Sequence, residues 1–199
     1  MKTRHKAVFN AAMRSLSCMM FATALLLNGP PLAATSSVTI GGPFTLTGSD
    51  GTTVTDQTYR GRWLLVFFGY TSCPDVCPTT LFEIATALQK LGPDAAKVQP
   101  IFITVDPQRD TRQVLEEYTR SFDRRIVGLT GTSDQIAAAA QEYGAYYVRR
   151  HTGPAGEDYL IAHSSYLYLM NPRGQFVRGV DAGTSADRLT EMLRELMAQ

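Results

Sequence analysis

The chain lacks most of the features that mark membrane, nucleic-acid-binding or multidomain proteins. Its longest predominantly apolar run, residues 16–27, has about a dozen residues, well short of the roughly 20 that a membrane-spanning helix needs. Beyond residue 34 the arginines are scattered among acids without a basic run, so we expect no nucleic-acid partner. No internal repeat or linker divides the 199 residues, and no tract is polar enough to remain disordered. These absences favour one folded domain of ordinary size.

The first 34 residues have the order of a secretory signal peptide. Four basic residues and no acid stand before or at the start of the apolar run, and the segment ends in the small residues Ala33 and Ala34. We therefore expect a domain at residues 35–199 that is periplasmic or otherwise exported. The alternative is an uncleaved segment that anchors the domain to the inner membrane, the one case in which we expect membrane contact. Cleavage would change the net charge from +1 to −3, because only basic residues are lost.

The remaining sequence alternates between predicted strands and helices. Residues 38–56 predict an opening hairpin, a continuous apolar run at 63–69 predicts a buried strand, and residues 98–106 predict the next buried strand. Apolar residues at helical spacing predict four helices, and two further patterns predict a short strand and a closing hairpin. These segments are 78–93, 111–122, 132–144 and 184–197 for the helices, 125–130 for the strand and 164–180 for the hairpin. The pattern predicts an α/β fold with a central sheet flanked by helices.

Cysteine is scarce, with three residues in the chain, and Cys18 belongs to the predicted signal. An exported domain would keep only Cys73 and Cys77, separated by three residues, in an oxidising compartment. Each precedes a proline, which disfavours the helical conformation, so we expect both cysteines outside regular helix. Pro78 suits the first helical position and would make Cys77 the N-terminal cap. The positive end of the helix dipole would then lower the pKa of the Cys77 thiol.

The cysteine pair has several chemical interpretations. A structural disulfide is disfavoured, because so small a loop contributes little entropy. A redox pair is possible, although a thioredoxin-like pair has two intervening residues. A soft metal bound by two thiolates normally needs a third ligand, and imidazole suits both copper and zinc, including an open zinc site with a catalytic water.

Histidine is equally scarce, with three residues to supply that ligand. His5 belongs to the predicted signal, and His151 stands next to glycine and proline, which is typical of an exposed loop tip. His163 comes immediately before a predicted strand. In a thioredoxin-like layout the loop before that strand packs against the cysteine loop. We therefore expect a metal site formed by Cys73, Cys77 and His163.

Three separated motifs carry a resemblance to a known family. FFGYTSCPDVCPTTL, ITVDPQRDT and DYLIAHSSYLYLMNPRG, in this order, resemble the Sco/SenC family of exported copper proteins over nearly the whole expected domain. The resemblance implies a thioredoxin-like fold with an extra N-terminal hairpin. It also implies that Cys73, Cys77 and His163 bind copper, as Cu(I), Cu(II) or both.

The resemblance further implies a function and partners. The expected function is a copper chaperone that delivers the metal to the copper A centre in subunit II of cytochrome c oxidase, without enzymatic bond breaking. A partner thiol reductase would keep the cysteines reduced. The alternative is a thiol-disulfide reductase that acts on partner cysteines through Cys73 and Cys77.

The chain departs from the family pattern at two positions. Ala162 stands where many members have an aspartate directly before the histidine, and Arg112 stands where many have a proline. The first change removes a carboxylate that could orient the histidine, a role for which Asp106 or Asp158 is a candidate. Asp106, Arg109 and Asp110 either hydrogen-bond the cysteine loop or form a strand-ending turn and helix cap.

Overall fold

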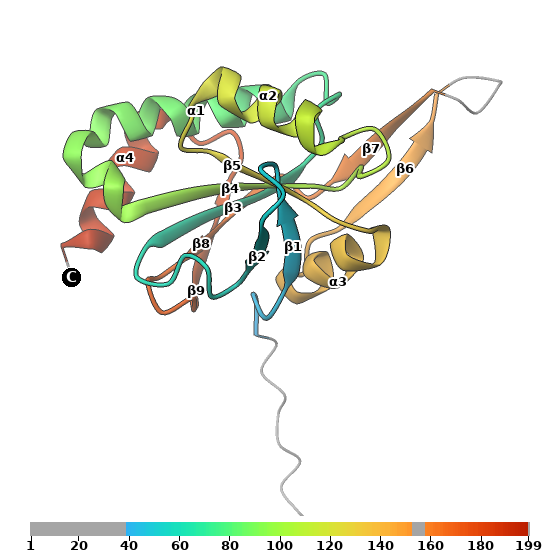
Figure 1. Cartoon of the computed structure of the whole chain (residues 1–199). Coiled ribbons are helices and arrows are strands. Elements are labelled where there is room, and N and C mark those ends of the chain that lie inside the picture. The colour runs from blue at the N-terminus through green and yellow to red at the C-terminus, as the bar shows by residue number, and fades with distance from the viewer. Residues whose placement is uncertain (1–38, 153–157, 199) are drawn as a thin grey trace, which may run out of the picture. The chain divides into compact units, whose positions relative to one another are not determined.

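The computed structural model describes residues 39–152 and 158–198, so the predicted signal at residues 1–34 lies outside the described part (Figure 1). The described residues form one compact unit. Its strands are β1 (Thr45–Gly48), β2 (Thr53–Thr55), β3 (Trp63–Gly69), β4 (Val98–Thr104), β5 (Val127–Thr130), β6 (Tyr147–His151), β7 (Tyr159–His163), β8 (Tyr166–Met170) and β9 (Phe176–Asp181). Its helices are α1 (Val76–Leu91), α2 (Arg112–Phe122), α3 (Ser133–Tyr143) and α4 (Ala186–Met197), with a 3-10 helix (Gly92–Lys97) after α1.

Seven strands form one sheet in the order β2-β1-β5-β4-β3-β8-β9. β3, β4 and β5 are parallel neighbours, whereas β8 and β9 continue the sheet antiparallel beyond β3. Every residue of β4 is buried, and in β3 every residue after Trp63 is buried. β3 is apolar throughout and β4 is mostly apolar, with Gln99 and Thr104 buried, because helices cover the two faces of the sheet. The opening hairpin β1–β2 and the closing hairpin β8–β9 confirm the two predicted hairpins.

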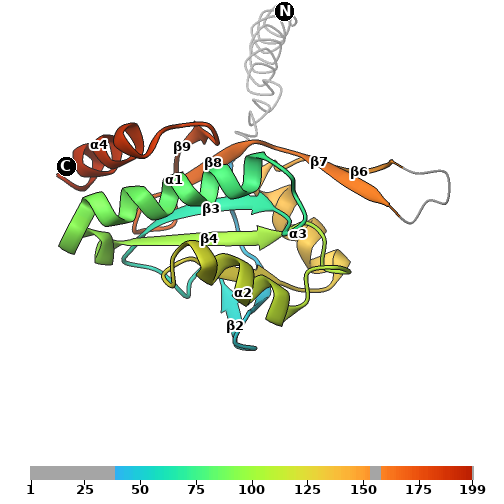
Figure 2. The same cartoon turned by 90° about the horizontal axis from the view of Figure 1, so that it is seen from above.

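The helices cover the sheet from both sides. α1 and α2 lie on one face with α4 packed beside α1, and α3 lies on the other face (Figures 1 and 2). On the α3 face, the Tyr143 ring packs 5.6 Å from Phe68 and 5.5 Å from Tyr168, measured between ring centroids. On the α2 face, Leu115 lies so close to β5 that a Cβ at Gly128 would come within 2.6 Å of it. The predicted sheet flanked by helices, with an extra N-terminal hairpin, is confirmed.

Side-chain caps explain where three helices begin. The Thr111 hydroxyl accepts a hydrogen bond from the Val114 N–H at the start of α2, and Ser185 caps α4 in the same way. Thr132 and Gln135 form a reciprocal capping box at α3, which ends at Gly144 in the left-handed conformation. These contacts satisfy main-chain groups that have no partner within the helix. The sequence predicted both ends of α3 from these residue types.

A second, two-stranded sheet formed by β6 and β7 was not predicted. This hairpin extends away from the main sheet (Figures 1 and 2). His151 is the last residue of β6 rather than part of a loop, although it is exposed as expected. His163 is the last residue of β7 and is separated from β8 by two residues, so the hairpin leads back into the sheet beside β3. Within the described ranges, none of the helices has the length and apolarity needed to span a bilayer.

Candidate metal centre

The cysteines lie at the carboxyl end of β3, where the chain turns into α1. The structure corrects the expected start of this helix: α1 begins at Val76, Asp75 is its cap, and Cys77 lies within the first turn. Proline is tolerated here because the first N–H groups of a helix have no intrahelical partner. Pro78 can therefore follow Cys77 inside the first turn. Cys73 remains in the preceding loop, outside the helix, as expected.

Gly69, the last residue of β3, allows the Cys77 side chain to sit against the sheet. A Cβ at position 69 would lie 2.7 Å from Cys77 Sγ and 2.7 Å from the ring of Phe102. Carbon atoms in folded proteins do not approach this closely without displacement of a neighbour. Glycine is therefore required by the close approach of these two side chains. The sequence pattern did not predict this role for Gly69, although its place between a buried strand and the cysteine loop was visible.

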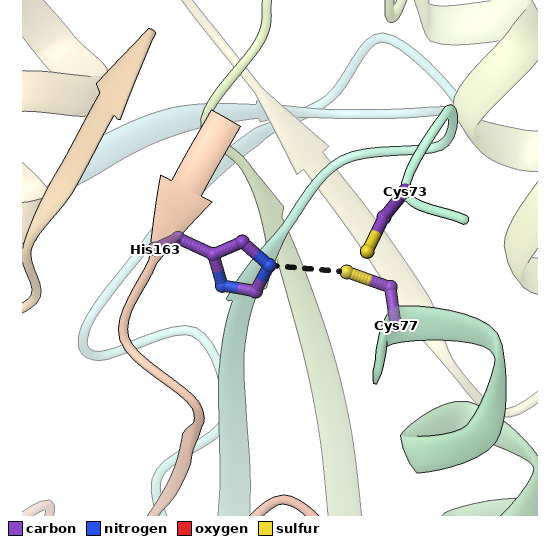
Figure 3. Close-up of side chains that lie close together, drawn as sticks. All are labelled: Cys73, Cys77 and His163. Carbon is purple, nitrogen blue, oxygen red and sulfur yellow. Dashed lines mark hydrogen bonds between the residues drawn. The ribbon is translucent and has the colours of Figure 1, made fainter. Parts of the chain in front are cut away.

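Cys73, Cys77 and His163 come together as the sequence predicted (Figure 3). Their sulfur and nitrogen atoms all lie within 4.8 Å of one another, and Cys77 Sγ is 3.4 Å from His163 Nε2. Cys77 is fully buried, Cys73 has 9% of its surface exposed, and His163 is partly buried. Both cysteines are free thiols. Such a donor set, two sulfurs and one imidazole nitrogen, is chemically suited to copper and to zinc.

The imidazole of His163 is held by its neighbours in one orientation. Its Nδ1 lies 3.0 Å from the carbonyl oxygen of Ser164, and because a carbonyl only accepts, Nδ1 carries the proton in this contact. In the neutral ring, Nε2 then has a free lone pair directed toward Cys77. The rings of Phe67 and Tyr70 pack against the imidazole in T-shaped arrangements, with centroids 6.0 Å and 5.9 Å away. His163 is thus preorganised to donate through Nε2.

The pKa of Cys73 is lowered and the pKa of Cys77 is raised, whereas the sequence predicted a lowered pKa for Cys77. A hydrogen bond from Cys77 is the main cause that lowers the pKa of Cys73, and hydrogen bonds from main-chain N–H groups act in the same direction against burial. The same hydrogen bond to the Cys73 thiolate raises the pKa of Cys77, and its complete burial raises it further. The prediction that the helix terminus lowers the pKa of Cys77 is therefore wrong. Burial and the neighbouring thiolate outweigh the dipole.

Asp110 fixes the start of the cysteine loop. Its carboxylate accepts hydrogen bonds from the Thr71 N–H at 3.0 Å, the Thr71 hydroxyl at 2.6 Å and the Thr104 hydroxyl at 2.5 Å. Asp110 is 1% exposed, and burial raises its pKa although these hydrogen bonds oppose the shift. Of the two interpretations left open for this motif, contact with the cysteine loop therefore holds for Asp110.

Asp106 instead ties the β6–β7 hairpin to the main sheet. Its buried carboxylate pairs with Arg109 and accepts a hydrogen bond from the Tyr159 hydroxyl at 2.8 Å, and Arg149 lies 3.6 Å away. The Arg109 guanidinium stacks 3.8 Å from the centroid of the Tyr159 ring and donates to the Tyr159 carbonyl at 3.2 Å. A charge stacked on an aromatic ring and bonded to its main chain resists hairpin movement.

Neither candidate carboxylate orients His163. The carboxylate of Asp106 is occupied by the hairpin contacts, and Asp158 is exposed at the opposite end of β7 from His163. The Ser164 carbonyl takes the position at Nδ1 that was expected for a carboxylate. Main-chain carbonyls often serve in this way for histidines that bind metals. Nothing in the residue pattern could have revealed this partner, since every residue type offers the same carbonyl.

The fold and the cluster define the class of protein: a thioredoxin-like α/β domain with two thiols and an imidazole at the carboxyl end of its central strands. The family model described as SCO1/SenC matches residues 33–198. The chain belongs to this family.

Several relatives are similar over most of the chain. The copper-bound structure of ScoI from Bradyrhizobium japonicum is 42% identical, with a TM-score of 0.73, over 78% of this chain and 98% of that one. Protein SCO1 homolog 1, mitochondrial, from Arabidopsis thaliana is 40% identical over 153 residues, which are 76% of this chain and 45% of the relative. Protein SCO1, mitochondrial, from Saccharomyces cerevisiae is 38% identical over 78% of this chain and 54% of the relative. The chain thus spans about half the length of these two mitochondrial relatives.

Proposed function

We propose that this chain is an exported copper chaperone that binds copper through Cys73, Cys77 and His163 and delivers it to the copper A centre of cytochrome c oxidase subunit II. The observation that carries the proposal is the 3.4 Å approach of His163 Nε2 to Cys77 Sγ within a three-donor cluster. The resemblance to the Sco/SenC motifs and the copper-bound relative from Bradyrhizobium japonicum support copper as the metal. Residues 1–34 would direct export or, if they are retained, anchor the domain to the membrane.

The protonation state of the cluster suits reversible binding. A metal needs both sulfurs as thiolates, so copper binding must displace the proton that Cys77 holds in the metal-free protein. Thiolates favour Cu(I), and three donors leave room for a further ligand, as Cu(II) would require. Because Cys77 is fully buried and Cys73 reaches the surface, a partner thiolate would enter beside Cys73. Copper would then pass by ligand exchange, with no substrate bond made or broken.

The second candidate is thiol-disulfide reduction of partner cysteines by the same pair. The observation that favours it is the lowered pKa of Cys73, the more exposed of the two thiols. A surface thiolate next to a buried, protonated thiol is the arrangement expected of an attacking and a resolving cysteine. Either function requires a thiol reductase that returns Cys73 and Cys77 to the reduced state.

The variant His163→Ala separates the two candidates. We expect the reduced variant to lose stoichiometric copper binding, measured by metal analysis and absorption spectroscopy, and to lose support of oxidase assembly. It should keep its activity as a dithiol, because both sulfurs remain. Unchanged oxidase assembly with His163→Ala would contradict the chaperone proposal and favour the reductase. His151→Ala is the matched control, since His151 is exposed at the far end of β6. Zinc titration of the same proteins tests whether the three donors bind zinc instead of copper.

A further inference from the structure

A groove beside Cys73 is lined by two segments that are distant in the sequence. It has a volume of about 420 Å³ and runs between the cysteine loop and β7. The loop side presents Pro74 and Val76, and the hairpin side presents Leu160 and Ala162. Leu160 is 42% exposed, although it is a large aliphatic residue. The groove therefore combines an apolar lining with direct access to the sulfur that reaches the surface.

The edge of β7 that borders this groove has no partner strand. The second sheet contains only β6 and β7 among the described residues. In an antiparallel pair the N–H and C=O groups of one residue point to the same side. The Ile161 N–H donates to the Tyr70 hydroxyl, and the Tyr159 carbonyl accepts from Arg109, so the main chain of alternate residues points away from β6. The register of the β6–β7 pair gives the Ile161 carbonyl and the His163 N–H the same direction, so an added strand could pair with these two groups.

The charges along the groove differ between its two sides. Arg150 is exposed on the hairpin side and forms none of the ion pairs found among the described residues. Its neighbour Arg149 already faces the buried carboxylate of Asp106. Asp75 stands on the loop side, at the start of α1. An occupant that carries a carboxylate would be attracted to the hairpin side and repelled from the loop side, which fixes its orientation.

We propose that this groove docks an extended, cysteine-bearing segment of a partner protein, with aliphatic residues beside the cysteine and an acidic residue that pairs with Arg150. This inference rests on the proposed function, because it describes the partner segment that would exchange copper at Cys73. The segment pairs with the Ile161 carbonyl and the His163 N–H on the edge of β7, its aliphatic side chains contact Leu160 and Val76, and its thiol lies against Cys73. The same docking serves a partner that donates copper and one that receives it.

A thiol-exchange experiment tests the groove without copper. In a chain with Cys18→Ser and Cys77→Ser, Cys73 is first converted to a mixed disulfide with 2-thiopyridine. A peptide thiolate then attacks the Cys73 sulfur, the peptide–Cys73 disulfide forms, and pyridine-2-thione leaves with the electron pair of the broken bond and is detected by absorbance. The probes are the blocked peptides Glu-Val-Cys-Val-Glu and Lys-Val-Cys-Val-Lys. Each rate is divided by that of the same peptide with free 2,2′-dithiodipyridine, which removes differences in thiol reactivity.

We expect the acidic peptide to react about three- to fivefold faster than the basic one after this correction, the size of effect given by one partly exposed ion pair. Arg150→Glu should reverse the preference, and Leu160→Ser should slow both peptides. Arg178→Glu on β9 is the matched control, because Arg178 is exposed and does not line the groove. Equal corrected rates for the two peptides, or a preference that survives Arg150→Glu, would overturn the proposal.

The proposed function and the groove fail in distinguishable ways. If the chain does not bind copper but still prefers the acidic peptide through Arg150, the docking proposal is supported and the chaperone function is contradicted. If copper binding depends on His163 and the two peptides react at equal corrected rates, the docking proposal is contradicted and the chaperone function is supported. Thermal unfolding of Arg150→Glu and Leu160→Ser, compared with the unsubstituted chain, checks that neither substitution acts by loss of the fold.

Discussion

The Nδ1 atom of His163 donates its proton to the main-chain carbonyl of Ser164, the next residue, over 3.0 Å. The imidazole is therefore oriented by the turn between β7 and β8 rather than by a carboxylate. This contact explains how the chain can have Ala162 where many family members have an aspartate. Side chains alternate along a strand, so Ala162 lies on the opposite face of β7 from His163.

The substitution Ala162→Asp should therefore change copper binding little. An aspartate on the exposed face of β7 cannot displace the Ser164 carbonyl from Nδ1 without rotation of the strand. We expect copper retention, measured by competition with a Cu(I) chelator, to change less than about threefold. A gain of tenfold or more would contradict the assignment of the Ser164 carbonyl as the orienting group.

Removal of Cys77 should raise the pKa of Cys73. In the metal-free reduced protein the hydrogen bond from Cys77 is the main cause that stabilises the Cys73 thiolate. The alkylation rate of Cys73 by iodoacetamide should persist into acidic solution in the unsubstituted chain, and in Cys77→Ala its midpoint should move to higher pH. Mass spectrometry of digested protein assigns the alkylated residue. An unchanged midpoint would mean that the main-chain N–H groups, rather than Cys77, stabilise the thiolate.

Asp110 should make a pH-dependent contribution to stability. Its pKa is raised in the folded protein, so folding favours the protonated carboxyl. The stabilisation that results from the raised pKa is fully present below the unfolded pKa of about 4. It is lost as pH rises through the higher folded pKa. The difference in free energy of unfolding between the unsubstituted chain and Asp110→Asn should therefore decrease from about pH 4 toward pH 7. Urea unfolding at several pH values measures it, and a difference that increases with pH would contradict the prediction.

Gly69→Ala should destabilise the protein and disturb the metal centre. The added Cβ would collide with Cys77 Sγ and the Phe102 ring, each 2.7 Å away, and we expect a cost of about 1–3 kcal/mol. Copper retention should fall as well, because Cys77 must move. Gly179→Ala on β9 is a suitable control, since its nearest contact would be an ordinary 3.7 Å from Tyr166. Denaturant unfolding and the chelator competition compare the two variants.

Tyr159→Phe tests whether the hairpin contacts position His163. The change removes the hydrogen bond to Asp106 but keeps the ring beneath Arg109, and we expect a loss of about 1–2 kcal/mol of stability. Amide exchange in β6 and β7 should accelerate more than exchange in β3, and copper release should become faster. Tyr166→Phe removes an exposed hydroxyl outside this network and serves as the control. Uniform acceleration of exchange in all strands would indicate global destabilisation instead.

The sequence predicted the parts of this fold that depend on strong local patterns. β3 is a continuous apolar run, β4 is mostly apolar, and α3 carries both its cap residues and its terminal glycine. His163 followed from the scarcity of histidine and the motif around it. The β6–β7 hairpin was missed because its strands are five residues long and one reads YVRRH, with three of its residues exposed. Short strands with charged residues do not differ in pattern from loops.

Other properties of the site depend on the tertiary structure. The order in which the two thiols lose their protons follows from the complete burial of Cys77 against Gly69 and Phe102, which local sequence does not specify. The contacts of Asp106 with Tyr159 and Arg149 join segments more than forty residues apart. The motif around Asp110 indicated contact with the cysteine loop, but the alternative of a helix cap had the same residue types.

The distance along the chain between the donors has a consequence for biogenesis. Cys77 and His163 are 86 residues apart, and β7 must dock before the imidazole meets the sulfurs. A chain that has not yet folded can offer copper two neighbouring thiols but not the complete set of three donors. Copper binding by all three donors therefore requires the C-terminal half to be in its native position. Tight binding of copper should in turn stabilise the fully folded chain over partly folded states.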